Sequence, residues 1–128
     1  MDIQGTWKTN GNNWISSSDR RVKKDIVDFD ERYEVLFDNL KPKNFKYVDG
    51  NRGRVHSGFI AQDVTAAIEE GNMTLDEVAY VCAFENREGD VYYGLRYEEL
   101  IALNTWQIQK LKSRVSELEN KIKQLEEN

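Results

Sequence analysis

The last quarter of the chain, from Ile101 to Leu125, constrains the fold most strongly. Apolar residues and one asparagine recur there at alternating intervals of three and four residues, which is the a/d seam of a coiled coil sustained for more than three heptads. The seam residues are Ile101, Asn104, Ile108, Leu111, Val115, Leu118, Ile122 and Leu125. At about 1.5 Å per residue this seam predicts a helical rod roughly 40 Å long, which is too exposed to be stable alone. We therefore expect the chain to self-associate.

Charges beside the seam favour parallel partners in register. Arg114 and Lys121 occupy g positions and face Glu119 and Glu126 at e positions of a neighbouring helix. β-branched residues at a with leucine at d favour a dimer, whereas Asn104 at a d position is a polar residue of the kind that fixes register and oligomeric state at a cost in stability. The seam by itself leaves a dimer and a trimer open.

Composition narrows the class of protein. The formal net charge of −5 argues against broad nucleic-acid binding and against adhesion to an anionic membrane, because both need a dominant positive field. One cysteine and one histidine allow neither a disulfide framework nor a zinc cluster, so we predict no metal and no cofactor. Cys82 has apolar neighbours and is predicted to be a buried core thiol. We find no apolar run near the roughly 18 residues of a membrane span and no signal-peptide pattern, and we expect a soluble chain made in a cytoplasm.

The chain divides into three parts. Residues 1–17 are rich in Asn, Gly, Ser and Thr and read as the end of a preceding stalk or as a leader, either a strand pair around Trp7 and Trp14 or a flexible segment. Residues 18–96 have room for one small globular domain. Residues 97–128 are predicted to be the coiled-coil helix, with Leu100 and Leu103 off the seam and packed onto the globular domain.

The globular part alternates helical and hairpin patterns. Asp30 can cap a helix that presents Tyr33, Leu36, Phe37 and Leu40 on one face and cannot continue past Pro42. Strands are predicted at 44–48, 55–60, 78–84 and 91–95, and a second helix at 62–70, with Val64, Ala67 and Ile68 inward and Gly71 ending it. This order predicts an α+β domain of short helices and β-hairpins followed by a long C-terminal helix.

A serine-lysine pair is the candidate for chemistry. Ser18 stands five residues before Lys23, and a neutral lysine is one known base for a serine nucleophile. The positive neighbours Arg20, Arg21 and Lys24 disfavour protonation of Lys23. Side chains five apart on a helix point about 140° from each other, so a working pair requires a turn or a loop.

The same residues also fit simpler roles. A serine before Asp19 is an ordinary helix cap or turn residue, and the basic run from Arg20 to Lys24 is ordinary for a solvated surface, a localisation signal or a phosphate-binding patch. From spacing alone these readings outweigh catalysis.

Several sequence blocks, taken together and in order, resemble a known family. These are the Ser-Asp-x-x-x-Lys block, a Leu-Lys-Pro and a Phe-Lys-Tyr triplet, the stretch containing Gly-Phe-Ile-Ala-Gln, and the segment that runs into the heptads, at residues 18–26, 40–42, 45–47, 56–64 and 97–103. The pattern is similar to the C-terminal, self-cleaving intramolecular chaperone domain of phage tailspikes, tail fibres and neck appendages, of the endosialidase type. The resemblance spans roughly residues 16–118.

The resemblance implies a homotrimer, and so a parallel trimeric coiled coil, that assists folding of a preceding β-rich stalk of the same polypeptide. It also implies release by autoproteolysis between Ser17 and Ser18, with Ser18 as nucleophile and Lys23 as general base. The work would be done in the host cytoplasm during virion assembly, and the parent protein would belong to the virion tail or appendage. The stalk would be the folding client.

Three further residues enter as accessory candidates. His56 has either an accessory role in processing or a structural hydrogen bond at a strand end. Gln62 is expected to satisfy backbone groups where a strand gives way to a helix, and Asp19 either orients Lys23 or caps a turn. Gly58 is expected to serve backbone geometry or close packing.

Two other functions remain open at this point. The chain can be a trimerisation cap of the same fold that never cuts, with Ser18 as a turn residue. It can also be a coiled-coil adaptor or regulatory module in which Arg20 to Lys24 bind phosphate or nucleic acid, although the net charge weighs against this.

Overall fold

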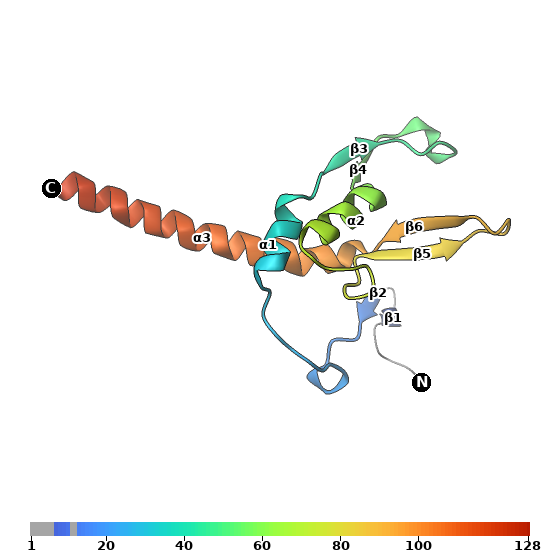
Figure 1. Ribbon diagram of the computed structural model, residues 1–128, viewed down its shortest axis with the longest axis horizontal. Helices are drawn as coiled ribbons and strands as arrows, with labels where there is room; N and C mark the ends of the chain where they lie inside the picture. Colours follow the sequence, from blue (N-terminus) through green and yellow to red (C-terminus); the bar gives the residue numbers. More distant parts are fainter. Residues whose placement is uncertain (1–6, 11–12) are drawn as a thin grey trace.

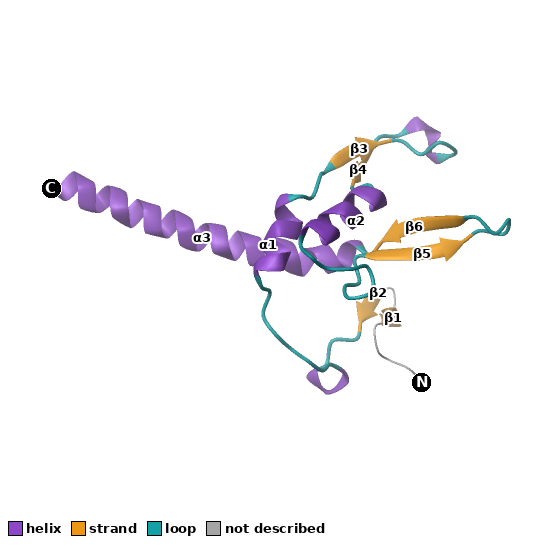
Figure 2. Ribbon diagram, viewed as in Figure 1, coloured by secondary structure: helices purple, strands orange, loops and turns teal. Residues whose placement is uncertain are grey.

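The computed structural model describes residues 7–10 and 13–128, and it has the predicted α+β order (Figures 1 and 2). Within these residues three α-helices accompany three separate antiparallel strand pairs. The elements are β1 (Trp7–Asn10), β2 (Asn13–Ser16), the 3-10 helix η1 (Arg20–Val22), α1 (Glu31–Asp38), β3 (Lys43–Phe45), the 3-10 helix η2 (Asn51–Gly53), β4 (His56–Gly58), α2 (Ala61–Glu70), β5 (Val81–Glu85), β6 (Val91–Leu95) and α3 (Tyr97–Glu127).

The core forms where α1 and α2 meet the first turns of α3 (Figure 1). Leu36, Ile68 and Leu103 are fully buried there, one from each helix. The complete buried cluster is Leu36, Val64, Ala67, Ile68, Met73, Tyr80, Val81, Leu100 and Leu103. The predicted inward faces of both short helices are therefore confirmed, as is the packing of Leu100 and Leu103 onto the globular part.

Helix α1 begins as its sequence predicts. The Asp30 carboxylate accepts a hydrogen bond from the Arg32 backbone N–H at 3.0 Å, which satisfies one of the free donors at the helix start. Two contacts then hold α3 beside this region: Lys110 donates to the Glu34 carboxylate, and the Trp106 ring stacks on Phe29 with centroids 5.1 Å apart.

Gly71 ends α2 beside the Arg32 carbonyl of α1. A Cβ added there would lie 2.6 Å from the Arg32 carbonyl oxygen, which is closer than a Cβ atom approaches in real structures. Gly71 has an ordinary negative φ of −79°, so the requirement for glycine comes from packing between the helices and not from backbone conformation.

The β3–β4 hairpin is shorter than predicted. Only three pairs form, Lys43 with Gly58, Asn44 with Ser57 and Phe45 with His56, whereas the sequence pattern extended the strands to Val48 and back from Val55. The connection leaves the ladder through left-handed conformations at Gly50, Arg52 and Gly53. Val48 and Val55 are exposed, so continued pairing would not be stabilised by packing of their side chains.

The β5–β6 hairpin matches the predicted positions except at its start. Strand β5 begins at Val81, and the Tyr80 carbonyl still accepts from the Arg96 backbone N–H at 2.9 Å, in register with the Val81–Leu95 pair. The pairing ends there because β6 ends at Leu95 and the chain enters α3 at Tyr97. Cys82 is only half-buried beside Gly94, so the prediction of a buried core thiol was wrong in degree.

Strands β1 and β2 pair antiparallel, with Thr9 opposite Trp14. The strand pair predicted as one reading of residues 1–17 is thus present, while the parts of that prediction at residues 1–6 and 11–12 lie outside the described residues.

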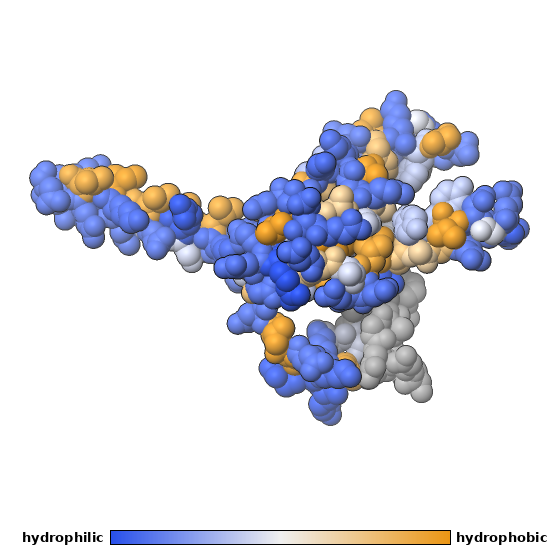
Figure 3. All heavy atoms as spheres, in the orientation of Figure 1, coloured by the Kyte–Doolittle hydropathy of each residue, from blue (hydrophilic) through white to orange (hydrophobic). Residues whose placement is uncertain are grey.

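Helix α3 begins at Tyr97, as predicted, and leaves the core as a free rod (Figure 1). Apolar side chains gather along one edge of this rod (Figure 3). The seam residues on the rod, from Ile108 to Leu125, are between 47% and 74% exposed in the single chain. The apolar seam is thus uncovered by any part of the chain that the structure describes. No described helix has the length and apolar character of a membrane span.

We expect Gly71→Ala to lower the free energy of unfolding by about 1–3 kcal/mol, because the new methyl group overlaps the Arg32 carbonyl. Chemical denaturation measures this value. Glu70→Ala is the matched control, because Glu70 is exposed and adjacent. Equal stability of the two variants would contradict the packing role of Gly71.

Candidate functional site

The serine-lysine pair lies on a short exposed turn between β2 and α1. Asp19 has extended dihedral angles, φ −65° and ψ 136°, and residues 20–22 then form the single turn of η1. The Val22 N–H donates to the Asp19 carbonyl at 3.0 Å, and the Lys23 N–H donates to the Arg20 carbonyl at 3.1 Å. Lys23 itself returns to an extended conformation. Ser18 and Lys23 thus stand at the two ends of a tight turn.

The turn brings the two functional groups into contact. The Lys23 Nζ lies 2.6 Å from the Ser18 Oγ, within hydrogen-bond distance. Both residues are exposed, and Ser17 is half-buried. In this contact the lysine donates to the serine; to act as a base it must be neutral and accept the hydroxyl proton, a state that burial favours. The arrangement provides the geometry of a nucleophile and base pair on a surface that is still open to water.

Asp19 does not contact Lys23. Its carboxylate accepts from the Arg21 backbone N–H at 2.8 Å and from the Arg21 guanidinium at 3.0 and 2.9 Å. Hydrogen bonding to Arg21 lowers the pKa of Asp19, so the group remains a carboxylate at neutral pH. Of the two roles considered for Asp19, the structure favours the cap of the turn.

His56 and Gln62 lie apart from the pair. Figure 1 shows β4, which carries His56, on the opposite side of the helices from the blue turn of η1. The His56 ring stacks on Phe45 and meets the edge of Tyr47, with centroids 5.9 and 5.0 Å away. Its Nε2 has no hydrogen-bond partner among the described residues, so the predicted structural hydrogen bond is not made by that atom.

Gln62 is exposed in the first turn of α2, and within the described residues its side chain makes no hydrogen bond to the backbone at the start of the helix. The structure therefore brings neither His56 nor Gln62 to Ser18 within one chain. Among the described residues we find no group of three or more potential metal ligands.

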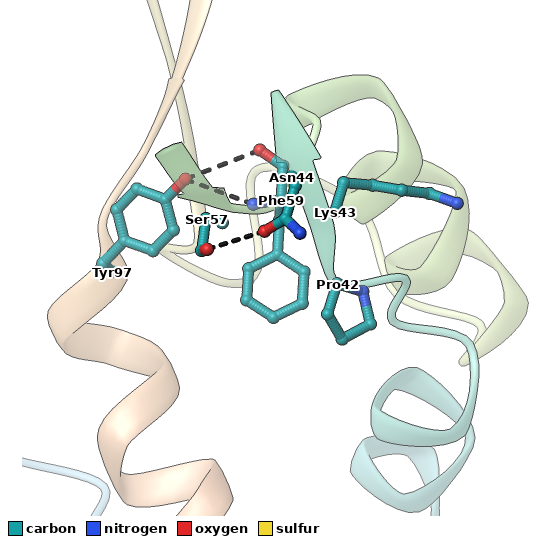
Figure 4. A pocket seen from close by; sticks show the side chains of 7 residues that line it. Pro42, Lys43, Asn44, Ser57, Phe59 and Tyr97 are labelled. Carbon is teal, nitrogen blue, oxygen red and sulfur yellow. Dashed lines mark hydrogen bonds between the residues drawn. The ribbon is translucent and has the colours of Figure 1, made fainter. Parts of the chain in front are cut away.

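Tyr97 lies in the sequence block at residues 97–103, but the sequence motifs gave it no role of its own. In the structure it lines a cavity beside β3 and β4. Its hydroxyl accepts from the Phe59 N–H at 3.3 Å and donates to the Phe59 carbonyl at 3.5 Å (Figure 4). A Cβ at Gly58 would lie 2.5 Å from this hydroxyl, which confirms close packing as the reason for that glycine. Tyr97 thereby fixes the start of α3 against the segment after β4.

The surrounding cavity has a volume of about 530 Å³. It is lined by Pro42, Lys43, Asn44, Ser57, Gly58, Phe59 and Tyr97. Ser57 donates to the Asn44 Oδ1 at 2.7 Å across the strand pair (Figure 4). The polar groups at this cavity bond mainly to one another and hold β3, β4 and α3 together.

Comparison with known proteins agrees with this fold. One crystal structure, described as a novel intramolecular chaperone, superposes with a TM-score of 0.62 at 22% identity, covering 76% of this chain and 99% of its own. The carboxy-terminal domain of the bacteriophage T5 L-shaped tail fibre with its intramolecular chaperone domain superposes with a TM-score of 0.55 at 18% identity. That match covers 91% of this chain but only 33% of the T5 chain. No curated protein sequence matches.

A family model also matches the sequence itself, over residues 18–72. The family carries a peptidase name, Peptidase S74, and is described as the chaperone of endosialidase. The resemblance drawn from the sequence motifs is therefore confirmed: residues 18–72 carry the sequence pattern of the chaperone of endosialidase, on a fold shared with structures described as intramolecular chaperones.

Proposed function

We propose that this chain is a trimeric intramolecular chaperone that assists folding of a preceding stalk and then releases itself by cutting its own Ser17–Ser18 bond. The observation that carries the proposal is the 2.6 Å contact between Lys23 Nζ and Ser18 Oγ. The family match begins at Ser18, the residue after the bond that would be cut. The peptidase name of the family supports the same chemistry.

The contact between Lys23 and Ser18 supports the following course of cleavage. The Ser18 Oγ attacks the carbonyl carbon of Ser17, and the Lys23 amine takes the hydroxyl proton. The peptide C–N bond then breaks, an ester to Ser18 Oγ forms, and the proton on Lys23 passes to the released α-amine of Ser18. Water hydrolyses the ester, which gives a Ser17 carboxylate and restores the Ser18 hydroxyl. Because the nucleophile is covalently adjacent to its carbonyl, attack benefits from proximity and happens once per chain.

The seam of α3 supports self-assembly, and the family resemblance favours three copies. Its apolar residues are exposed in the single chain, and burying them against partner helices removes apolar surface from water. Three chains held in register at the rod lower the entropy cost of starting a stalk whose contacts are far apart in sequence. The T5 tail-fibre structure, whose described chaperone domain accompanies a fibre, supports a fibre or tailspike stalk as the client in this chain.

This assignment places the work in the host cytoplasm, during virion assembly. Cleavage after folding makes assembly irreversible, because the released chaperone domain is no longer connected to the stalk. The alternative function is the trimerisation cap of the same fold that never cuts. The first experiment below distinguishes it from the self-cleaving chaperone.

We expect Ser18→Ala and Lys23→Ala to abolish cleavage, because the first removes the nucleophile and the second its base. Intact mass of purified protein should show wild type divided before Ser18 and both variants whole. Ser17→Ala is the control, since it keeps the Ser18 hydroxyl and the Lys23 amine. Wild type that stays whole as a trimer after long incubation would support the alternative function, a trimerisation cap that never cuts.

We expect Val115→Asp to convert the trimer to a monomer, because it places three charges at one layer of the seam. Sedimentation equilibrium should give about one third of the wild-type mass, the ratio of monomer to trimer. Ser116→Asp adds the same charge at the outward b position and should stay trimeric. Dissociation of both variants, or of neither, would argue against the seam as the interface.

Assembly is also expected to control cleavage. A monomeric Val115→Asp chain should cut at least about tenfold more slowly, because its exposed pair lacks a covering chain that excludes water. Time courses of intact mass under identical conditions measure the rates. Cleavage as fast in the folded monomer as in the trimer would rule out this coupling.

A further inference from the structure

The η1 turn keeps its shape without support from the core. None of its three residues is buried, and Arg20 and Arg21 are both exposed. Burial of apolar surface therefore does not fix this turn, in contrast to α1 and α2. What fixes it is a set of hydrogen bonds made among residues 19–23.

One carboxylate makes three of these bonds. Asp19 Oδ1 accepts from the Arg21 backbone N–H and from Arg21 Nε, while Asp19 Oδ2 accepts from Arg21 Nη2 at 2.9 Å. The first bond caps the turn, and the other two hold the planar guanidinium side-on against the carboxylate. The Asp19 side chain is thereby fixed at both oxygens.

The chain uses the same arrangement a second time. At the start of α1, Asp30 accepts from the Arg32 backbone N–H at 3.0 Å, from Arg32 Nε at 3.1 Å and from Arg32 Nη2 at 2.8 Å. There the Asp-x-Arg pair begins a helix whose Leu36 is fully buried. At η1 the pair begins a turn in which only Val22 is half-buried, yet Ser18 precedes the turn and Lys23 follows it directly.

The pair also determines which groups surround the lysine amine. An uncompensated carboxylate one residue from Ser18 would compete with the serine oxygen for the Lys23 amine. Arg21 occupies both oxygens of Asp19 instead, and the Lys23 Nζ meets the Ser18 Oγ. Because an ion pair at this exposure adds little to global stability, its main consequence is local geometry.

We propose that Asp19 and Arg21 are positioning residues for autoproteolysis: together they close the η1 turn and so hold the Lys23 amine at the Ser18 hydroxyl. This inference rests on the proposed self-cleavage and names residues beyond the nucleophile and its base. Neither residue takes part in proton transfer or contacts the carbonyl that is attacked. They act through the backbone between positions 18 and 23.

Cleavage rates of substituted full-length chains test this role. Asp19→Ala removes the cap and the ion pair, and should slow cleavage about fivefold or more, the factor that corresponds to loss of a typical capping side chain. Asp19→Asn keeps an oxygen that can cap the turn and should recover part of the rate. Arg21→Ala removes the ion pair but keeps the bond from the Asp19 carboxylate to the backbone N–H of residue 21, so it should resemble Asp19→Asn. Combining Asp19→Asn with Arg21→Ala should add little further loss, since both remove the same ion pair.

Two matched controls separate positioning from stability. Arg20→Ala removes one positive charge beside Lys23, as Arg21→Ala does, but from an exposed side chain that makes no bond among the described residues. It should therefore cut faster than Arg21→Ala, and the difference between the two rates measures the effect of the Asp19–Arg21 pair. Asp30→Ala removes the equivalent cap and ion pair at the start of α1, so it should lower the melting temperature while the folded trimer still cuts normally. The Asp19 and Arg21 variants should show the reverse, with an unchanged melting temperature and trimer mass. Their Val22 and Lys23 amides should also exchange hydrogen faster than in wild type.

The outcomes distinguish this inference from the proposed function. If wild type cuts and Asp19→Ala and Arg21→Ala cut as fast as Arg20→Ala, the positioning role is wrong while self-cleavage stands. If Asp19→Asn is as slow as Asp19→Ala and exchange at Val22 and Lys23 is unchanged, Asp19 acts by its charge and not by closing the turn, which also overturns the inference. If wild type never cuts as a trimer, both proposals fall together.

Discussion

The structure depends on one helix, α3, whose first turns belong to the core and whose remaining turns carry the exposed seam. The first turns of α3 bury Leu100 and Leu103 against α1 and α2, and the remaining turns carry the exposed seam from Ile108 to Leu125. Because the helix is continuous from Tyr97 to Glu127, the packing of its first turns fixes the direction of the whole rod. The contacts of Tyr97 with Phe59 and of Lys110 with Glu34 secure that direction at two further points. Any partner that joins the seam is thereby oriented relative to the globular domain.

The proposed chemistry sits outside this scaffold. Ser18 and Lys23 meet through an exposed turn held by hydrogen bonds among near neighbours, while the core is held by apolar contacts between distant segments. A site of this kind can form early and independently, but water reaches it freely in a single chain. Burial by a neighbouring protomer would change the environment of the lysine without altering the turn. A locally formed site that a partner chain would cover is the physical basis on which the proposed reaction would wait for assembly.

The ends of β3, β4 and β5 show the limit of what a local sequence pattern predicts. Strands β3 and β4 end after three pairs, because Val48 and Val55 meet no apolar surface in the single chain. Strand β5 starts at Val81 because its partner β6 ends at Leu95, where the chain turns into α3. In both cases alternation of apolar and polar residues predicted strands correctly in place and wrongly in length. Strand ends are decided by where the partner strand ends and by whether an apolar surface is available, and a local sequence pattern contains neither.

The sequence by itself determined the features that depend on neighbours along the chain. Asp30 as a cap, the inward faces of α1 and α2, the start of α3 and the seam spacing are all local, since helix geometry alone sets which residues share a face. Only the tertiary structure decided that Gly71 must admit the Arg32 carbonyl, that Gly58 must admit Tyr97, and that His56 lies away from Ser18. It also showed Asp19 turned toward Arg21, leaving the Lys23 amine to Ser18. These relations depend on the path of the backbone through space, which is fixed by contacts among residues far apart in sequence or by a particular turn, and periodicity encodes neither.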